Sequence, residues 1–231
     1  MSASRLPAFL LAGLAACGGV APDPEAIAAD LPSPREPTAA ERDELARLRR
    51  ELQVQQALQL VDEVEEKAHE ILALDPRDAR ATAALGTCWM RRAQRRLPPD
   101  LSLWRRAEGQ LRKAQRLAPE DPEVALQLAA FFEADGHLAA AAAALDPVAF
   151  GRQRHVGVLR ALSRLRYELG EEKLAIAALQ ALLVEDPGDV QATFRLAHAQ
   201  ARVATAAAAC SSAAFAIRRF STACSARRGR A

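Results

Sequence analysis

Apolar residues recur at three- and four-residue intervals through the middle of the chain, which is the pattern of helices with one buried side. The first such stretch covers residues 41–75, and Thr38 or the acidic residues from 41 to 43 supply its start signal. It ends at Asp75-Pro76, because a residue before proline is pushed out of the helical region. No glycine or proline lies between residues 41 and 74, so the stretch fits one long helix or a degenerate hairpin of two.

From residue 76 to about 200 the pattern of a helical hairpin recurs at a spacing of 34. Pro119 and Pro187 are 68 residues apart, which is two units, whereas Pro76 and Pro119 are 43 apart, which is one unit with nine extra residues. We predict hairpins over 79–119, 122–155 and 156–189, and a partial unit over 190–217. The positions that match at 34 are Leu128 and Leu162, Ala129 and Ser163, Gly136 and Gly170, Ala141 and Ala175, and Leu145 and Leu179.

The extra residues of the first hairpin lie between Trp89 and Ala107. They contain a Pro-Pro-Asp turn in which Asp100 or Ser102 is placed to cap the following helix, so we predict helices over 79–95 and 101–117. In the second hairpin an alanine-rich helix should end at Asp146-Pro147 and be followed by a loop to about residue 154.

The step of 34 and its small and apolar positions resemble the tetratricopeptide repeat. The resemblance implies an all-α fold, a short α-solenoid of helical hairpins that bury their apolar sides by stacking on one another. The composition agrees, because half of the residues are hydrophobic but only 4% are aromatic, which suits close helix packing better than a sheet.

The resemblance also implies a groove in which the first helix of each hairpin binds an extended peptide or protein partner. The residues at the matching positions are Thr87, Arg91, Gln127, Ala130, Arg160, Arg164, Tyr167, Gln191, Arg195 and His198. Arg160, Arg164 and Arg195 resemble the cationic positions with which some members bind a peptide's terminal carboxylate, although the asparagines of that site are missing here. They indicate an acidic or C-terminal peptide, and the alternative is that they only solvate the helix surface.

A net charge of +2 makes no general case for a nucleic-acid partner. A local basic cluster surrounds the insertion and fits lipid headgroups, an acidic partner or a solubilising surface. Its residues are Arg91, Arg92, Arg95, Arg96, Arg105, Arg106, Arg112 and Lys113.

The first 17 residues have the layout of an export signal, with Arg5 ahead of an apolar run from 6 to 16. Its end, Leu14-Ala15-Ala16-Cys17, resembles the lipobox of bacterial lipoproteins, which implies cleavage before Cys17 and a lipid anchor on Cys17. Gly18 follows, and lipoproteins without aspartate there usually go to the outer membrane, facing the periplasm. The alternatives are an ordinary secretory signal or a hydrophobic start that is not exported.

Residues 18–40 contain five prolines and no apolar period, so we predict a disordered tether. The other end changes abruptly, because Asp189 is the last acidic residue of the chain and residues 218–231 are basic. This change in composition has two interpretations: a basic amphipathic segment that binds a surface, or an incomplete repeat whose end has decayed, is truncated or was read out of frame. In either case we predict that residues 218–231 are disordered.

Chemical motifs are sparse. Cys210 and Cys224 are a candidate disulfide pair in an oxidising compartment, but the cysteines and four histidines have no metal-ligand spacing. The chain also lacks nucleophile-elbow, P-loop and dinucleotide motifs. We therefore expect no metal, no cofactor and no enzyme activity.

Together these features predict a lipid-anchored envelope scaffold or adaptor. The alternatives are a fragment of a longer repeat protein, a docking arm of an envelope enzyme complex, and a secretion or pilus assembly factor.

Overall fold

The computed structural model describes residues 38–96, 98, 100–151 and 154–205, and all of these belong to the unit that runs from residue 37 to 231. The predicted anchor at Cys17, the tether apart from its last residues, the Cys210–Cys224 pair and the tail lie outside the described residues. The described residues form α-helices and contain no strand. This confirms the predicted all-α fold.

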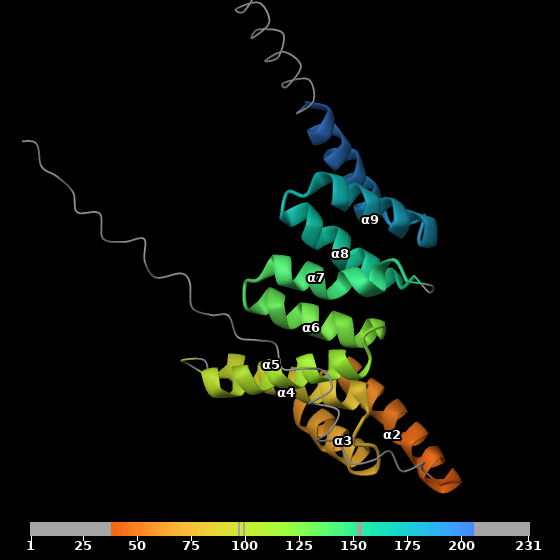
Figure 1. Cartoon of the computed structure of the whole chain (residues 1–231), viewed down its shortest axis with the longest axis vertical. Helices are drawn as coiled ribbons and strands as arrows, with labels where there is room; N and C mark the ends of the chain where they lie inside the picture. The colour runs from red at the N-terminus through yellow and green to blue at the C-terminus, as the bar shows by residue number, and fades with distance from the viewer. Residues whose placement is uncertain (1–37, 97, 99, 152–153, 206–231) are drawn as a thin grey trace, which may run out of the picture. The chain divides into compact units, whose positions relative to one another are not determined.

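The helices follow one another as hairpins (Figure 1). Short loops join α2 to α3, α4 to α5, α6 to α7 and α8 to α9, and residues 190–205 form a further helix. The bounds are Ala39–Ala57 for α2, Val61–Leu74 for α3, Ala79–Arg95 for α4, Leu101–Leu117 for α5, Pro122–Ala134 for α6, Leu138–Ala149 for α7, Val156–Glu168 for α8 and Glu172–Glu185 for α9. We call α2, α4, α6, α8 and residues 190–205 the first helices, because α2, α4, α6 and α8 each open a hairpin and 190–205 takes the same position in the repeat.

The stretch from 41 to 75 thus contains two helices rather than one. Thr38 begins α2 with a capping box, in which its side chain accepts a hydrogen bond from the Glu41 N–H and the Glu41 carboxylate accepts one from the Thr38 N–H. The break between α2 and α3 includes Gln59, whose φ of 59° lies in the left-handed region. Val61 and Val64 of α3 then pack with Leu52 of α2 in one buried cluster.

Aspartates set the starts of the next first helices. Asp78 caps α4 by accepting a hydrogen bond from the Ala81 N–H, and Asp121 caps α6 by accepting from the N–H groups of Glu123 and Val124. Asp100 caps α5 in the same way and also accepts the Ser102 hydroxyl, which resolves the choice between these two residues. The long first hairpin accommodates its extra residues as longer helices, since α4 and α5 each have 17 residues against 13 in α6.

The prediction that the alanine-rich helix of the second hairpin ends at Asp146-Pro147 is wrong. Helix α7 runs through Pro147 to Ala149. Val148 and Ala149 are both buried in the same cluster as α8, so their packing holds the last turn despite the missing proline N–H.

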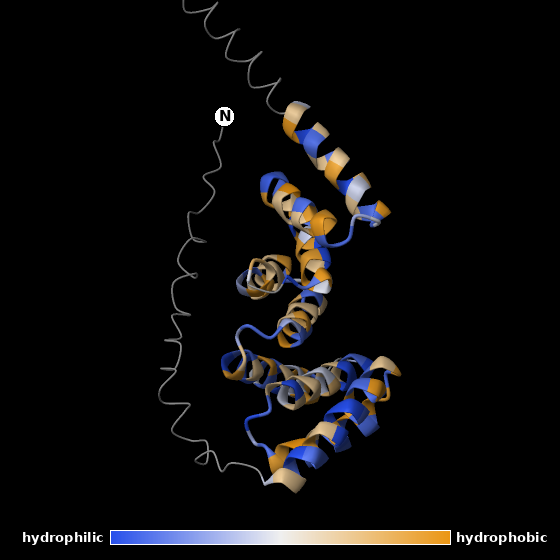
Figure 2. Ribbon diagram, turned by 90° about the vertical axis from the view of Figure 1, so that its right-hand side faces the viewer, coloured by the Kyte–Doolittle hydropathy of each residue, from blue (hydrophilic) through white to orange (hydrophobic). Residues whose placement is uncertain are grey.

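In the described residues three hydrophobic clusters form the core, and each spans more than one hairpin. The first joins α2, α3 and α4, the second α4, α5 and α6 with one residue of α7, and the third runs from α6 through α9 to Ala192. Figure 2 shows the corresponding pattern, in which helices carry hydrophobic residues along one side and hydrophilic residues along the other. Stacking of neighbouring hairpins therefore supplies the core, as repeat proteins require.

Candidate functional site: the pocket of the first helices

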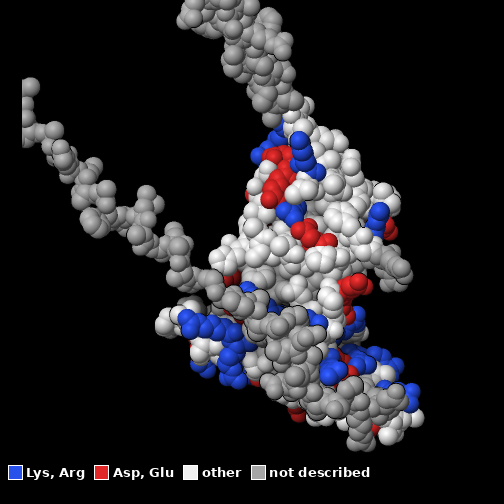
Figure 3. All heavy atoms as spheres, viewed as in Figure 1, with Lys and Arg blue, Asp and Glu red and all other residues white. Residues whose placement is uncertain are grey.

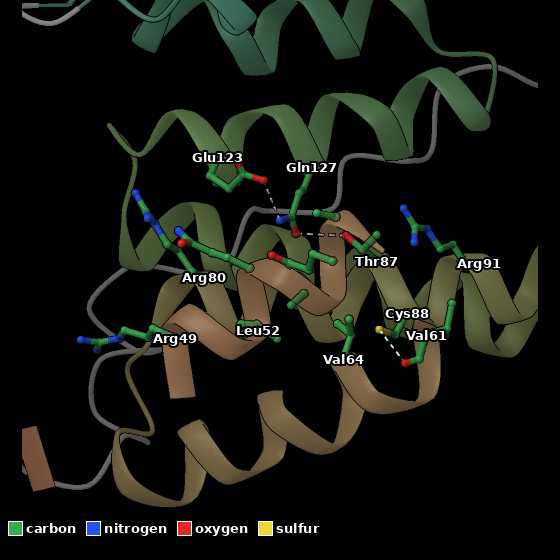
Figure 4. Close-up of a pocket in the computed structure, with 14 residues that line it drawn as sticks. Arg49, Leu52, Val61, Val64, Arg80, Thr87, Cys88, Arg91, Glu123 and Gln127 are labelled. Atoms are coloured by element: carbon green, nitrogen blue, oxygen red, sulfur yellow. Dashed lines mark hydrogen bonds between the residues drawn. The ribbon is translucent and has the colours of Figure 1, made fainter. Parts of the chain in front are cut away.

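A pocket of about 490 Å³ opens between α2, α4 and α6, with α3 contributing to its floor (Figure 4). Its floor is apolar and buried, and consists of Leu52, Val61, Val64, Ala84 and Cys88. Polar residues surround this floor: Arg49, Gln53, Gln56, Arg80, Thr87, Arg91, Glu123 and Gln127. The pocket has the size and the mixed lining of sites that hold small ligands or single side chains.

Three of the residues predicted from the sequence, Thr87, Arg91 and Gln127, lie in this pocket. The Thr87 hydroxyl donates to the Gln127 Oε1 atom at 3.0 Å, and this bond joins α4 to α6. The Gln127 amide in turn lies 3.4 Å from Glu123 Oε1. The polar side of the pocket is therefore held in place by bonds between first helices.

The charges around the pocket differ in how far they are neutralised. Arg49 and Arg80 lie at one end and Arg91 at the other (Figure 4). Arg49 donates to Asp78 at 2.7 Å, and Arg80 donates to Asp121 at 2.8 Å. Arg91 forms no ion pair or hydrogen bond with any other described residue, so its charge is available to a ligand.

Cys88 is not a reactive group in this floor. Burial raises the pKa of its thiol to about 12, and the nearby Glu65 carboxylate adds to the shift. Its Sγ atom lies 3.4 Å from the carbonyl oxygen of Val61. The thiol stays protonated at neutral pH and acts as a small apolar side chain.

The predicted carboxylate-binding arginines of α8 are occupied by acids of the chain itself. Arg160 donates to Asp186 and to Asp189, at 2.9 Å in each case. Arg164 donates to both carboxylate oxygens of Glu133 at 2.7 Å. The hydrogen bond to Glu133 is the first cause that raises the pKa of Arg164. The pair with Glu133 connects α8 to the preceding hairpin, and the pair with Asp189 connects α8 to the start of the helix at 190–205.

The remaining predicted residues lie further along the first helices. Tyr167 of α8 and His198 form a hydrogen bond of 2.8 Å between the hydroxyl and Nδ1, and the Phe194 ring stacks on His198. Arg195 is half-buried and has no ion pair among the described residues, and Gln191 and Ala130 are exposed. None of these lines the pocket, so the structure separates the predicted set into a pocket group and a C-terminal group.

Sequence reasoning missed the contribution of α2 to the pocket, although a signal for it exists. The run Asp75-Pro76-Arg77-Asp78 recurs 111 residues later as Asp186 to Asp189, with glycine in place of its arginine, and Arg49 recurs as Arg160 at the same distance. In both places the arginine outside the run binds the two aspartates, since Arg49 also reaches Asp75 at 3.2 Å. Hairpin α2–α3 is therefore a repeat of the same kind as α8–α9.

In the described part of the chain, no helix is long and apolar enough to cross a membrane, and no group of three or more histidines, cysteines or acids is placed to hold a metal ion.

No family model and no curated protein matches the sequence at a significant level. Several solved structures share the fold. A thermophilic tetratricopeptide-repeat protein of Thermus thermophilus aligns with a TM-score of 0.51 and 23% identity, over 64% of this chain and 77% of its own.

The Naa15/Naa10 complex bound to HypK-THB aligns with a TM-score of 0.58 and 13% identity, over 68% of this chain and 22% of that chain. A double mutant of MamA aligns with a TM-score of 0.50 and 16% identity, over 69% of this chain and 85% of that chain. At these identities the likeness concerns the fold. The chain has a tetratricopeptide-like fold, as its spacing of 34 predicts.

Proposed function

We propose that this protein is a non-catalytic scaffold that binds an extended segment of a partner protein across its first helices, with one side chain of that segment held in the pocket between α2, α4 and α6. The observation that carries the proposal is the combination of an apolar, buried floor with Arg91 at its edge, which has no ion pair among the described residues. The solved structures with this fold include a complex, that of Naa15 with Naa10 and HypK-THB, which is consistent with such a role.

The chemistry of the pocket selects the segment. Leu52, Val61 and Val64 offer apolar surface, so an aliphatic side chain gains by leaving water there. Arg91 offers a planar set of donors that suits a carboxylate. The preferred segment therefore carries an aliphatic residue next to an acidic residue or to a terminal carboxylate.

Arg91 thus takes the role that the sequence suggested for Arg160, Arg164 and Arg195. Arg195 also has no ion pair among the described residues, but it does not line the pocket. Arg160 and Arg164 would have to break their ion pairs with Asp186, Asp189 and Glu133 before they could bind a partner's carboxylate. An arginine without an ion pair has no such bonds to break.

Selection from a random peptide library displayed on phage tests this proposal. The bait is the full chain with Cys17→Ala, which keeps it free of lipid. We expect enriched peptides to combine an aliphatic residue with Asp or Glu. Calorimetry should then show that Arg91→Glu weakens binding of the best peptide by about 10- to 100-fold, which is the range expected for loss of a hydrogen bond to a charged group.

Two further variants make the test specific. Gln53→Trp places a ring at the exposed edge of the pocket and should block binding, whereas Arg116→Glu makes the same charge change on α5 and should leave it intact. The proposal is contradicted if the enriched peptides do not combine an aliphatic residue with an acidic one, or if Arg91→Glu and Arg116→Glu lose the same peptide affinity.

We also propose that the scaffold is anchored by a lipid on Cys17 and faces the periplasm from the outer membrane. The support is the four-residue lipobox at the end of the apolar run. Intact mass of the membrane-fraction protein from a Gram-negative host tests the anchor. A chain that begins at Cys17 with added acyl groups, absent in Cys17→Ala, supports it, and an unprocessed chain that begins at Met1 refutes it.

A further inference from the structure

The side of α5 that faces away from the core is strongly basic. Ala107, Leu111 and Ala114 are buried in the cluster with α4 and α6. On the outer side the helix carries five basic side chains and one carboxylate, Glu108, a net charge of +4. We call the basic residues the α5 basic face: Arg105, Arg106, Arg112, Lys113 and Arg116.

Most of this charge has no partner among the described residues. Arg105, Lys113 and Arg116 form no ion pair or hydrogen bond with any described residue. Arg112 lies 2.7 Å from Glu108, but both side chains are substantially exposed, and such pairs on a helix surface are weak. Arg106 lies over the Trp89 ring at 4.6 Å and keeps its charge there.

The end of α4 adds to the same region. Arg95 is exposed and unpaired among the described residues, whereas Arg96 pairs with Asp100 and Arg92 with Asp62. Figure 3 shows that basic side chains gather where α4 ends and α5 begins, with few acidic atoms among them. The region is therefore a positively charged surface and not an alternation of both signs.

The arrangement of the face indicates what it binds. From Arg105 to Arg116 the charges extend along roughly 16 Å of helix, at 1.5 Å per residue. Leu101, which is 68% exposed, lies one turn before Arg105 on the same side. A row of cations preceded by an exposed leucine fits a membrane surface, where the cations meet headgroups and the leucine enters the boundary of the acyl chains.

Nucleic acid fits this face less well. Single strands stack their bases on exposed aromatic rings. Trp104, the aromatic residue of α5, instead lies 4.8 Å from the Phe131 ring and donates a hydrogen bond to Asp135. A phosphate backbone also offers no apolar contact to Leu101, the exposed leucine at the start of the row.

From this geometry we propose that the α5 basic face binds the surface of membranes that contain anionic phospholipids. Each basic residue near such a surface strengthens binding by about fivefold. The pocket is lined by α2, α3, α4 and α6, and no residue of α5 takes part in it. The face can therefore rest on a membrane while the pocket holds a partner, and the proposal stands independently of the peptide proposal.

Vesicle binding tests this directly. The probe is the full chain with Cys17→Ala, added to vesicles of phosphatidylcholine with or without phosphatidylglycerol. We expect binding to require phosphatidylglycerol and to be lost at roughly 1 M salt, where the Debye length is about 3 Å. The variant with Arg105→Glu, Lys113→Glu and Arg116→Glu should bind at least about 100-fold more weakly, from three losses of about fivefold each.

A matched control separates this face from the net charge of the chain. Arg50, Arg77 and Lys173 are exposed, lie on other elements and have no ion pairs among the described residues, so changing all three to Glu gives the same total charge. Circular dichroism should show that both triple variants keep their helices. We expect the control to bind as tightly as the parent chain.

Three results would overturn the proposal. One is equal binding of the parent chain to both vesicle types, and another is an equal loss in the two triple variants. The third is tighter binding of a labelled DNA duplex than of vesicles, lost in the α5 variant, which would identify a nucleic-acid site.

Discussion

Replacing Gly86 with alanine should destabilise the fold, whereas the same replacement at Gly109 should stabilise it. Both glycines lie inside helices of the first long hairpin, Gly86 in α4 and Gly109 in α5. A Cβ atom at Gly86 would lie 2.7 Å from the Cγ atom of Leu111 and 3.1 Å from the carbonyl oxygen of Ala107. A Cβ atom at Gly109 would meet nothing within 4 Å.

The magnitudes follow from these distances. Alanine is favoured over glycine in a helix by about 1 kcal/mol, which is the expected gain at Gly109. At Gly86 the methyl group must displace Leu111, which is fully buried, or the α5 backbone. Overpacking of this kind costs about 1–3 kcal/mol, and the severe contact places it near the upper end. The net effect of Gly86→Ala should then be a loss of about 1–2 kcal/mol.

Urea unfolding followed by far-ultraviolet circular dichroism measures both changes. The Gly86→Ala midpoint should fall below that of the parent chain and the Gly109→Ala midpoint should rise above it. Because repeat arrays can unfold in parts, near-ultraviolet signals of Trp89 and Trp104 should report the same order in this hairpin. A Gly86→Ala chain as stable as the Gly109→Ala chain would refute the close approach of α4 and α5 at this point.

Three other predictions concern charges and the buried thiol. Asp78→Ala should lower the free energy of unfolding by about 1–2 kcal/mol, because it removes the cap of α4 and leaves Arg49 without its nearest partner. Asp78→Asn should lower it less, and the urea midpoints of both variants test this. The hydrogen bond from the Ala192 N–H, followed by Arg160, lowers the pKa of Asp189 in the folded state. Its contribution to stability is therefore present above the unfolded pKa and lost as pH falls through the folded value, so Asp189→Asn should flatten the fall in melting temperature below about pH 4. Cys88 should resist iodoacetamide in the folded chain at pH 8 and react in urea, as read by peptide mass spectrometry; fast labelling without urea would contradict its burial.

The hairpins could be predicted from the sequence because their signals are local. Aspartate caps and prolines mark where α4 and α5 begin and end, and the spacing of 34 relates α6 to α8. The break between α2 and α3 could not, because residues 58–60 contain no glycine or proline. It exists because Leu52, Val61 and Val64 all pack in the cluster that includes α4, which is a tertiary effect.

The candidate site was predictable only in part, for a similar reason. Repeat positions identify which residues of the first helices face one side, and Thr87, Arg91 and Gln127 do meet in the pocket. Whether an arginine there is free depends on a neighbouring hairpin, since Arg164 finds its partner, Glu133, on α6 of the preceding hairpin. The helix through Pro147 likewise depends on burial of the two residues that follow it.

The most direct test of the central claim is to locate a bound peptide on the protein. A peptide from the library selection, with its aliphatic residue replaced by a photo-reactive leucine analogue, is bound to the chain, irradiated and mapped by mass spectrometry. The proposed pocket predicts adducts on fragments that contain α2, α3, α4 or α6, and their loss in Gln53→Trp. Adducts confined to α5, α7 or α9, or adducts that persist in Gln53→Trp, would contradict it.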